Sequence, residues 1–176
     1  FAETALLGRF AIHTDGGHIG GLSAVHLSAD GTSLIAVSDR GALLSGTISR
    51  GSDGEIVGIV IGEQASFQNP DLPNSRTSRD SEGVAVDSDG TIFVSFEGEH
   101  RIGKFASINA PEETLPIPRE FTALQSNSGL EALAIDSDGA LYTIPERSGR
   151  YDRPFPVYRF KNGARDQPYD IPRTGA

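Results

Sequence analysis

Hydrophobic and polar positions along the chain recur in three similar segments. Each segment contains two short apolar runs, and an Asp-Gly pair lies between the runs. Short runs of β-forming residues on either side of Asp-Gly are typical of β-hairpins. We therefore expect three hairpins of one kind. They cover Gly21–Asp39 (GLSAVHLSADGTSLIAVSD), Ser81–Glu97 (SEGVAVDSDGTIFVSFE) and Leu130–Glu146 (LEALAIDSDGALYTIPE).

The spacing of the three segments predicts a β-propeller. The Asp of the turn recurs at Asp30, Asp89 and Asp138, and a repeat of roughly fifty residues with this content is typical of propeller blades. Apolar residues occupy both faces of the predicted strands, as in the run 84–86, which fits small sheets stacked on both sides. A sustained apolar pattern with helical spacing is missing. We therefore predict one all-β domain over residues 1–176, built from four-stranded antiparallel blades.

The length of the chain limits the number of blades. At about fifty residues per blade, 176 residues give three to four blades, whereas closed propellers usually have four to eight. We expect the chain to be part of a longer ring, because an open stack leaves an edge strand and an uncovered face. The alternative is a small ring closed within this length. The stretches Gln68–Asp80 and Asn109–Arg119 read as loops between blades.

Composition and charge exclude several classes of protein. Hydrophobic residues make up 37% of the chain and charged residues 22%, as in ordinary globular proteins. The 15 Lys and Arg against 24 Asp and Glu give a net charge of −9, which argues against nucleic-acid binding and favours cations or neutral and basic ligands. There is no Cys, so disulfide scaffolds and thiol nucleophiles are excluded. No apolar stretch is long enough to cross a bilayer, so we expect no membrane span.

Carboxylates stand where the second and third hairpins open. A two-residue turn at Asp89-Gly90 predicts that Glu82 faces Glu97 across the strands, and the same turn in the third segment places Glu131 opposite Glu146. Directly opposed carboxylates repel each other unless a cation or a shared proton lies between them. The alternative is a three-residue loop with a bulge, which would place Glu82 opposite Phe96, or simple solvation of these strand ends.

These positions predict a cation site on the propeller axis. In the first segment Ser23 takes the place of Glu82, and Asp39 takes the place of Glu97. Equivalent positions of inner strands converge on the axis of a propeller. Calcium is the first choice because it accepts six to eight oxygen ligands, whereas zinc prefers His and Cys. The predicted metal ligands are Glu82, Glu131, Asp39, Glu97 and Glu146.

Three further residues are candidates for catalysis. His100 and Arg101 follow the second hairpin, where they would offer a proton-transfer group beside an anion binder. Arg40 follows Asp39 at the end of a predicted strand, where it would bind a phosphate or pair with Asp39. An exposed polar cluster is the alternative for His100 and Arg101. A nucleophile elbow of the G-x-S-x-G type is absent from the sequence.

Several of these motifs together resemble the phytase-like β-propeller family, known as esterase-like activity of phytase. The resemblance runs from about residue 20 to residue 172. It implies a longer bacterial propeller, periplasmic or secreted, with a further C-terminal part and a signal peptide that is not in this chain. The motifs are Gly20-Gly21-Leu22-Ser23, Ser38-Asp39-Arg40-Gly41, Asp80-Ser81-Glu82-Gly83-Val84-Ala85, Phe96-Glu97, His100-Arg101-Ile102 and Gly129-Leu130-Glu131-Ala132-Leu133-Ala134.

The residues and the resemblance leave three functions open. The first is a calcium-dependent phosphoester or ester hydrolase that acts on a small-molecule substrate at an acidic channel site. The second is a non-catalytic propeller that binds a ligand or a protein partner. The third is a calcium-dependent sugar-lactone hydrolase, which would share the channel glutamates. Similarity of fold alone does not decide between them.

Overall fold

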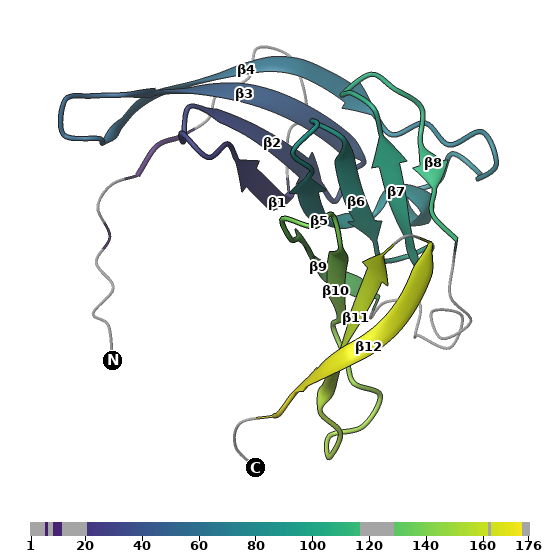
Figure 1. The fold of residues 1–176 in the computed structure, drawn as a ribbon. Helices are drawn as coiled ribbons and strands as arrows, with labels where there is room; N and C mark the ends of the chain where they lie inside the picture. Colours follow the sequence, from purple (N-terminus) through teal and green to yellow (C-terminus); the bar gives the residue numbers. More distant parts are fainter. Residues whose placement is uncertain (1–5, 7–8, 12–20, 117–128, 162, 174–176) are drawn as a thin grey trace.

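Three four-stranded antiparallel sheets make up the computed structural model (Figure 1). It describes residues 6, 9–11, 21–116, 129–161 and 163–173. In this part of the chain the helical structure is a short 3-10 helix, η1 (Thr77–Arg79), and no helix there has the length and apolar character needed to cross a membrane. The strands are β1 (Leu22–Leu27), β2 (Ser33–Ser38), β3 (Ala42–Arg50) and β4 (Ile56–Ser66) in the first sheet; β5 (Ser81–Val86), β6 (Ile92–Phe96), β7 (Arg101–Phe105) and β8 (Glu113–Thr114) in the second; and β9 (Leu130–Ile135), β10 (Leu141–Pro145), β11 (Phe155–Lys161) and β12 (Ala164–Ile171) in the third.

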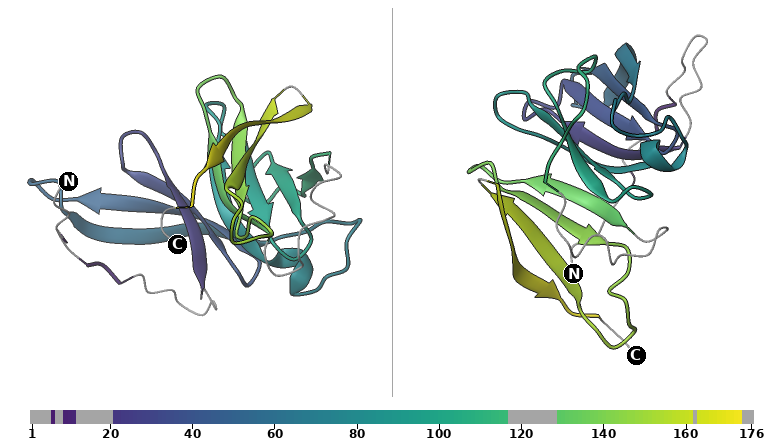
Figure 2. Two further views of the ribbon diagram at one scale, coloured as in Figure 1. Left: turned by 90° about the horizontal axis from the view of Figure 1, so that it is seen from below. Right: turned by 90° about the vertical axis from the view of Figure 1, so that its right-hand side faces the viewer.

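The sheets are arranged as blades. Within each sheet every strand pairs with the strand that follows it in the chain. The first strands of the three sheets, β1, β5 and β9, pack in order, with β5 in contact with both of the others. Two further views show the sheets fanning out, with the third sheet set at an angle to the first two (Figure 2). The prediction of four-stranded antiparallel blades is confirmed.

The turns of the repeated hairpins differ from the prediction. In the second sheet the Asp87 N–H donates to the Thr91 carbonyl at 2.9 Å, and the Gly90 N–H donates to the Asp87 carbonyl at 3.0 Å. The loop therefore has three residues and not two. Gly90 has φ +88°, the left-handed conformation that ends such a loop, and the Asp89 carboxylate accepts the Thr91 N–H at 2.8 Å. The third hairpin closes with the same pair of backbone hydrogen bonds.

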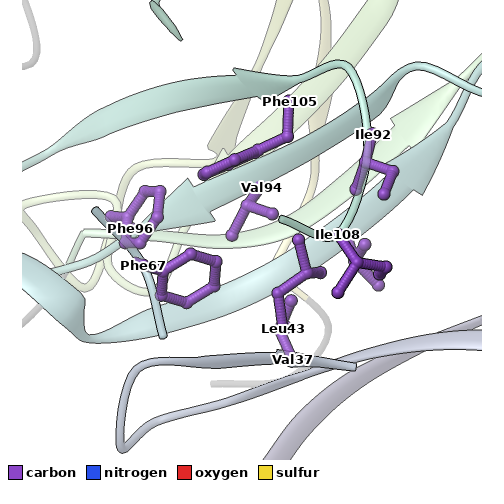
Figure 3. Packing of buried hydrophobic residues seen from close by; sticks show 9 residues of the cluster. Val37, Leu43, Phe67, Ile92, Val94, Phe96, Phe105 and Ile108 are labelled. Carbon is purple, nitrogen blue, oxygen red and sulfur yellow. The ribbon is translucent and has the colours of Figure 1, made fainter. Parts of the chain in front are cut away.

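Apolar side chains fill the space between adjacent sheets. One core cluster joins Val37 and Leu43 of the first sheet to the second sheet (Figure 3). Phe67, just after β4, packs edge-on against Phe96 with ring centroids 5.0 Å apart. A second cluster joins the second sheet to the third, so the second sheet is buried on both faces as the sequence predicts. This cluster contains Ala85, Ile102, Leu130, Leu141 and Tyr158.

The third sheet exposes to solvent a face whose residues match those on the buried face of the second sheet. Ala134 and Tyr142 stand at the register positions that Ala85 and Phe93 occupy in the second sheet. Ala85 is buried beneath the third sheet, whereas Ala134 is exposed. Residue types suited to contact between blades therefore remain uncovered among the described residues. The expectation that the chain belongs to a longer ring stays a prediction.

A buried ion pair lies beside the second sheet. The Arg101 side chain is 2% exposed and that of Glu112 is fully buried. Arg101 Nε donates to Glu112 Oε1 at 2.6 Å and Nη2 to Oε2 at 2.9 Å, and Nη2 also donates to the Ser78 carbonyl at 2.7 Å. The guanidinium lies 3.7 Å from the centre of the Phe96 ring. This pair links β7 to η1 and to the segment before β8.

The ion pair predicts a strong effect of removing one charge. We expect Glu112→Gln to lower the free energy of unfolding by about 3 kcal/mol or more, because Arg101 would remain charged and buried without its partner. Urea denaturation measures this change. The matched control is Glu113→Gln, whose exposed pair with Lys104 should contribute less than about 1 kcal/mol. Equal losses in both variants would contradict this role for the pair.

Candidate functional site

Each inner strand carries a β-bulge at the same position. The β5–β6 register skips Glu82, which is the extra residue of that bulge. The β9–β10 register skips Glu131 in the same way, and the β1–β2 register skips Ser23. A bulge bends the strand and turns the extra side chain away from its regular direction. The position that carries Glu82 in β5 and Glu131 in β9 is therefore bulged in all three inner strands.

The bulge corrects the predicted pairing of the carboxylates. Glu82 does not face Glu97, and Glu131 does not face Glu146, because the three-residue turn shifts the register by one position and the bulge shifts it again. The Glu97 N–H instead donates to the Asp80 carbonyl at 2.8 Å. The alternative pairing of Glu82 with Phe96 is also wrong, since Ser81 takes that place.

The carboxylates nevertheless converge. Carboxylate oxygens of Asp80, Glu82 and Glu97 lie within 4.8 Å of one another, and so do those of Glu97, Glu131 and Glu146. Glu97 belongs to both groups, so these five side chains form one continuous acidic cluster. Four of its members were predicted from the sequence as metal ligands, and they come from both the second and the third sheet.

Asp80 was missed by sequence reasoning. It directly precedes β5, at a place where the other two segments have Gly21 and Gly129. In all three hairpins the carbonyl at this place accepts the N–H of the residue just after the second strand. Because comparison of the repeats finds glycine twice at this position, the acidic side chain of the middle copy gave no repeated signal.

Asp39 lies beside the acidic cluster and not inside either group. Burial is the largest cause of the raised pKa values of Asp80 and Glu82, and the charge of Asp39 adds a smaller contribution to both. Its Oδ1 atom is buried and has no hydrogen-bond partner among the described residues. A Cβ on Gly21 would lie only 2.0 Å from this oxygen, so glycine is needed there. Asp39 therefore adds negative potential to the cluster from the first sheet.

A close approach of two inner strands holds the cluster together. A Cβ added to Gly83 would lie 2.6 Å from Ser95 Oγ and 2.8 Å from the backbone nitrogen of Leu133. Glycine at this position lets β5 lie directly against β9. As a result, the two bulged residues, Glu82 of β5 and Glu131 of β9, lie near each other.

Burial and mutual repulsion favour protonation of the cluster. Burial, followed by repulsion from Glu131, raises the pKa of Glu82 to about 7. Burial also raises the pKa values of Glu97 and Glu131, and neighbouring carboxylates add to both. In Glu97 the backbone N–H of Gly129 and the charge of His100 act in the opposite direction. At neutral pH burial and repulsion therefore favour a proton bound within the cluster, with Glu82 as its main site.

The cluster suits a hard divalent cation. Its ligands are all carboxylate oxygens, the type that calcium prefers. Two oxygens on opposite sides of a calcium ion lie about 4.6–5.2 Å apart, since each is about 2.3–2.6 Å from the ion. In each group the carboxylate oxygens are close enough together for one ion to bind all three side chains. A cation would remove the repulsion that raises these pKa values.

The three candidate catalytic residues lie in different environments. His100 packs against Gly129, where a Cβ would lie 2.4 Å from Nδ1, and this nitrogen is buried without a hydrogen-bond partner among the described residues. Its charge acts on Glu97, which places His100 beside the acidic cluster. Arg40 is exposed next to Asp39. The guanidinium of Arg101 is held in the interior by Glu112.

Solved structures with a similar fold are propellers. The β-propeller domain of Cps50 (Swd1) from Myceliophteria thermophila aligns with 78% of this chain and 38% of its own, at a TM-score of 0.52 and 12% sequence identity. The structure of U3-55K aligns over 86% of this chain and 39% of its own, at a TM-score of 0.50 and 13% identity. This chain thus spans about two fifths of their length. At such identities the likeness concerns the fold alone.

Comparison with sequence families identifies the group to which the chain is related. A search of curated proteins finds no match. The family model described as "Phytase-like: Esterase-like activity of phytase" matches residues 17–175, which include all three sheets and every member of the acidic cluster. The resemblance seen in the sequence motifs is therefore confirmed, and the chain belongs to the phytase-like family.

Proposed function

We propose that this chain provides the acidic channel site of a calcium-dependent hydrolase of small esters or phosphoesters. The observation that carries the proposal is the convergence of five carboxylates around Glu97. Repulsion in this group calls for a bound cation or shared protons. Membership of the phytase-like family supports a small-molecule substrate. A periplasmic or secreted location is part of the same proposal, because the family resemblance implies it.

Carboxylates of the second and third sheets would hold the ion. Glu97 lies at the centre because it belongs to both carboxylate groups. Glu82 and Glu131 come from the two bulges, while Asp80 shares a group with Glu82 and Glu146 shares a group with Glu131. A bound calcium ion would neutralise an anionic substrate and lower the pKa of a water molecule.

Two basic residues complete the proposed site. His100 lies beside Glu97, where its imidazole would serve as the proton-transfer group. Arg40 is exposed next to Asp39, so its guanidinium is free to reach a substrate anion. We leave Arg101 out of this site because Glu112 and two backbone carbonyls occupy its guanidinium. A sugar lactone is an internal ester and falls within the same chemistry.

Calcium titration tests the site directly. In the full-length protein that contains this chain, we expect saturable calcium binding by calorimetry. Glu97→Gln should weaken it most, and Glu82→Gln and Glu131→Gln should each weaken it by at least about tenfold, because each removes a charged ligand. Glu99→Gln is the matched control, an exposed glutamate in the loop after β6 that lies outside both groups.

The outcome of this titration separates two classes of function. Binding that all four variants retain equally would place the ion elsewhere. Absence of binding in the native protein would leave the cluster as a group of proton-sharing carboxylates. In that case the non-catalytic propeller that binds a ligand or a protein becomes the better hypothesis.

The raised pKa values predict a pH dependence of opposite sign for stability and for calcium affinity. The folded metal-free protein binds protons more tightly than the unfolded chain, so its stability should fall as pH rises from the ordinary value of 4.5 to about 7. Calcium competes with the same protons, so its affinity should rise over that range. Melting temperatures with and without calcium, at about pH 5 and about pH 8, measure both trends. In Glu82→Gln both trends should become shallower, and an unchanged slope in this variant would count against the assignment.

Turnover distinguishes a hydrolase from a binding platform. We expect the full-length protein to hydrolyse 4-nitrophenyl phosphate or a 4-nitrophenyl ester, to lose this activity in chelator and to regain it with calcium. His100→Gln should lower kcat, whereas Arg40→Gln should mainly raise KM for the phosphate. A double variant, Glu82→Gln with Glu131→Gln, that keeps full turnover would overturn the proposed role of the cluster.

A further inference from the structure

A separate pocket lies beside the junction of the first and second sheets. Its volume is about 350 Å³, and it is formed by the loop that follows β4, by the end of η1 and by the residues just before β8. The residues that line it include none of the five members of the acidic cluster. The pocket is therefore a different site from the proposed cation site.

The walls of the pocket are mainly apolar, with a small number of charged groups. Phe67, Leu72 and three prolines form the apolar walls, beside uncharged polar residues such as Gln68 and Asn69. Arg101 and Glu112 also line the pocket, but they neutralise each other in the buried ion pair. An apolar cavity with few, fixed polar groups is the usual form of a small-molecule site. The remaining charged group, Arg79, therefore decides which ligand fits.

Arg79 brings an uncompensated positive charge to the pocket. Its Nε donates to the Ser75 carbonyl at 3.2 Å, and this is the only polar contact of its guanidinium among the described residues. Burial raises the pKa of the neighbouring Asp80, and the guanidinium that opposes this rise is that of Arg76. In a chain with a net charge of −9, the pocket is thus a local positive region.

The position of Arg79 is fixed by the backbone of the first sheet. A Cβ on Gly41 would lie 2.6 Å from Cβ and 2.9 Å from Cδ of Arg79, so the arginine stem lies across this glycine. Gly41 has φ +86°, a conformation that other residues rarely adopt. The last residue of the Ser38-Asp39-Arg40-Gly41 motif therefore makes room for the arginine side chain.

We propose that this pocket binds a small organic monocarboxylate. The ligand's carboxylate would pair with Arg79, because two nitrogens of a guanidinium match the two oxygens of a carboxylate. Its apolar body would pack against Phe67 and Leu72. A single uncompensated charge matches a monoanion better than a phosphate dianion. The proposal does not depend on calcium or on hydrolysis.

Ligand-observed fluorine NMR tests the proposal with a defined probe. The probe is 4-fluorophenylacetate, and its neutral counterpart is 4-fluorophenylacetamide. Both are titrated into the full-length protein in chelator, so that failure of the calcium proposal does not affect the result. We expect the carboxylate to bind at least about tenfold more tightly than the amide, because only the carboxylate forms the charged pair.

Three variants decide where the probe binds. Arg79→Gln should weaken binding of the carboxylate by at least about tenfold and leave the weak binding of the amide unchanged. Leu72→Trp should abolish binding of both compounds by filling the cavity. The matched control is Arg153→Gln, an exposed arginine in the loop between β10 and β11 that should have no effect. Circular dichroism confirms the fold of each variant.

Several results would overturn the proposal. These are equal binding of the acid and the amide, an undiminished affinity in Arg79→Gln, or an equal loss in Arg79→Gln and Arg153→Gln, which would indicate general attraction of anions. Failure of the native protein to bind the carboxylate would overturn it as well. Should Leu72→Trp fail to fold, the comparison of the two arginine variants still gives the answer.

Discussion

Electrostatic repulsion among carboxylates at the inner strands is the constraint on which the candidate site depends. The second and third sheets approach so closely at Gly83 that an added Cβ would contact the backbone of the neighbouring strand. As a consequence of this contact, Glu82 and Glu131 lie close together. Repulsion between them adds to burial in raising the pKa of Glu82. The packing of apolar clusters on both faces of the second sheet opposes this repulsion and keeps the strands together.

The β-bulge explains how one short sequence pattern serves both the fold and the site. In a regular strand Glu82 would follow the strict alternation of faces that places Val84 in the core cluster. As the extra residue of a bulge it leaves this alternation, so the strand keeps its apolar positions while the carboxylate joins the acidic cluster. Because the third sheet has the same bulge at Glu131, the two copies add their charges at one place.

Much of the fold could be predicted from the sequence, whereas the exact register could not. The Asp-Gly turns and the two-sided apolar strands indicate hairpins and stacked sheets, because these features depend on local conformation and burial. The register depends on whether Ser88 belongs to the loop, a difference of one residue that leaves the pattern of the strands unchanged. The grouping of Glu82, Glu97 and Glu131 was still anticipated, since equivalent positions of inner strands converge in either register.

Features that arise from contacts distant in the sequence were not predictable in this way. Arg101 is adjacent to His100, and both stand in a polar segment, yet one is buried in an ion pair and the other lies beside the acidic cluster. The partner that fixes Arg101 is Glu112, in a stretch that reads as a loop. Only the folded chain shows that this loop returns to the interior beneath η1.

The same folded arrangement separates opposite charges across a very short length of chain. Arg79 and Asp80 are neighbours in sequence, but Arg79 lines the apolar pocket and Asp80 belongs to the acidic cluster. The start of β5 thus stands between a positive and a negative region, and Ser81 anchors it through a hydrogen bond of 2.8 Å from its hydroxyl to the Ser38 carbonyl. Because this hydroxyl is buried and its partner is in the first sheet, the junction cannot shift without disturbing both regions. A rigid junction keeps the acidic cluster and the positively charged pocket apart, so their charges do not neutralise each other.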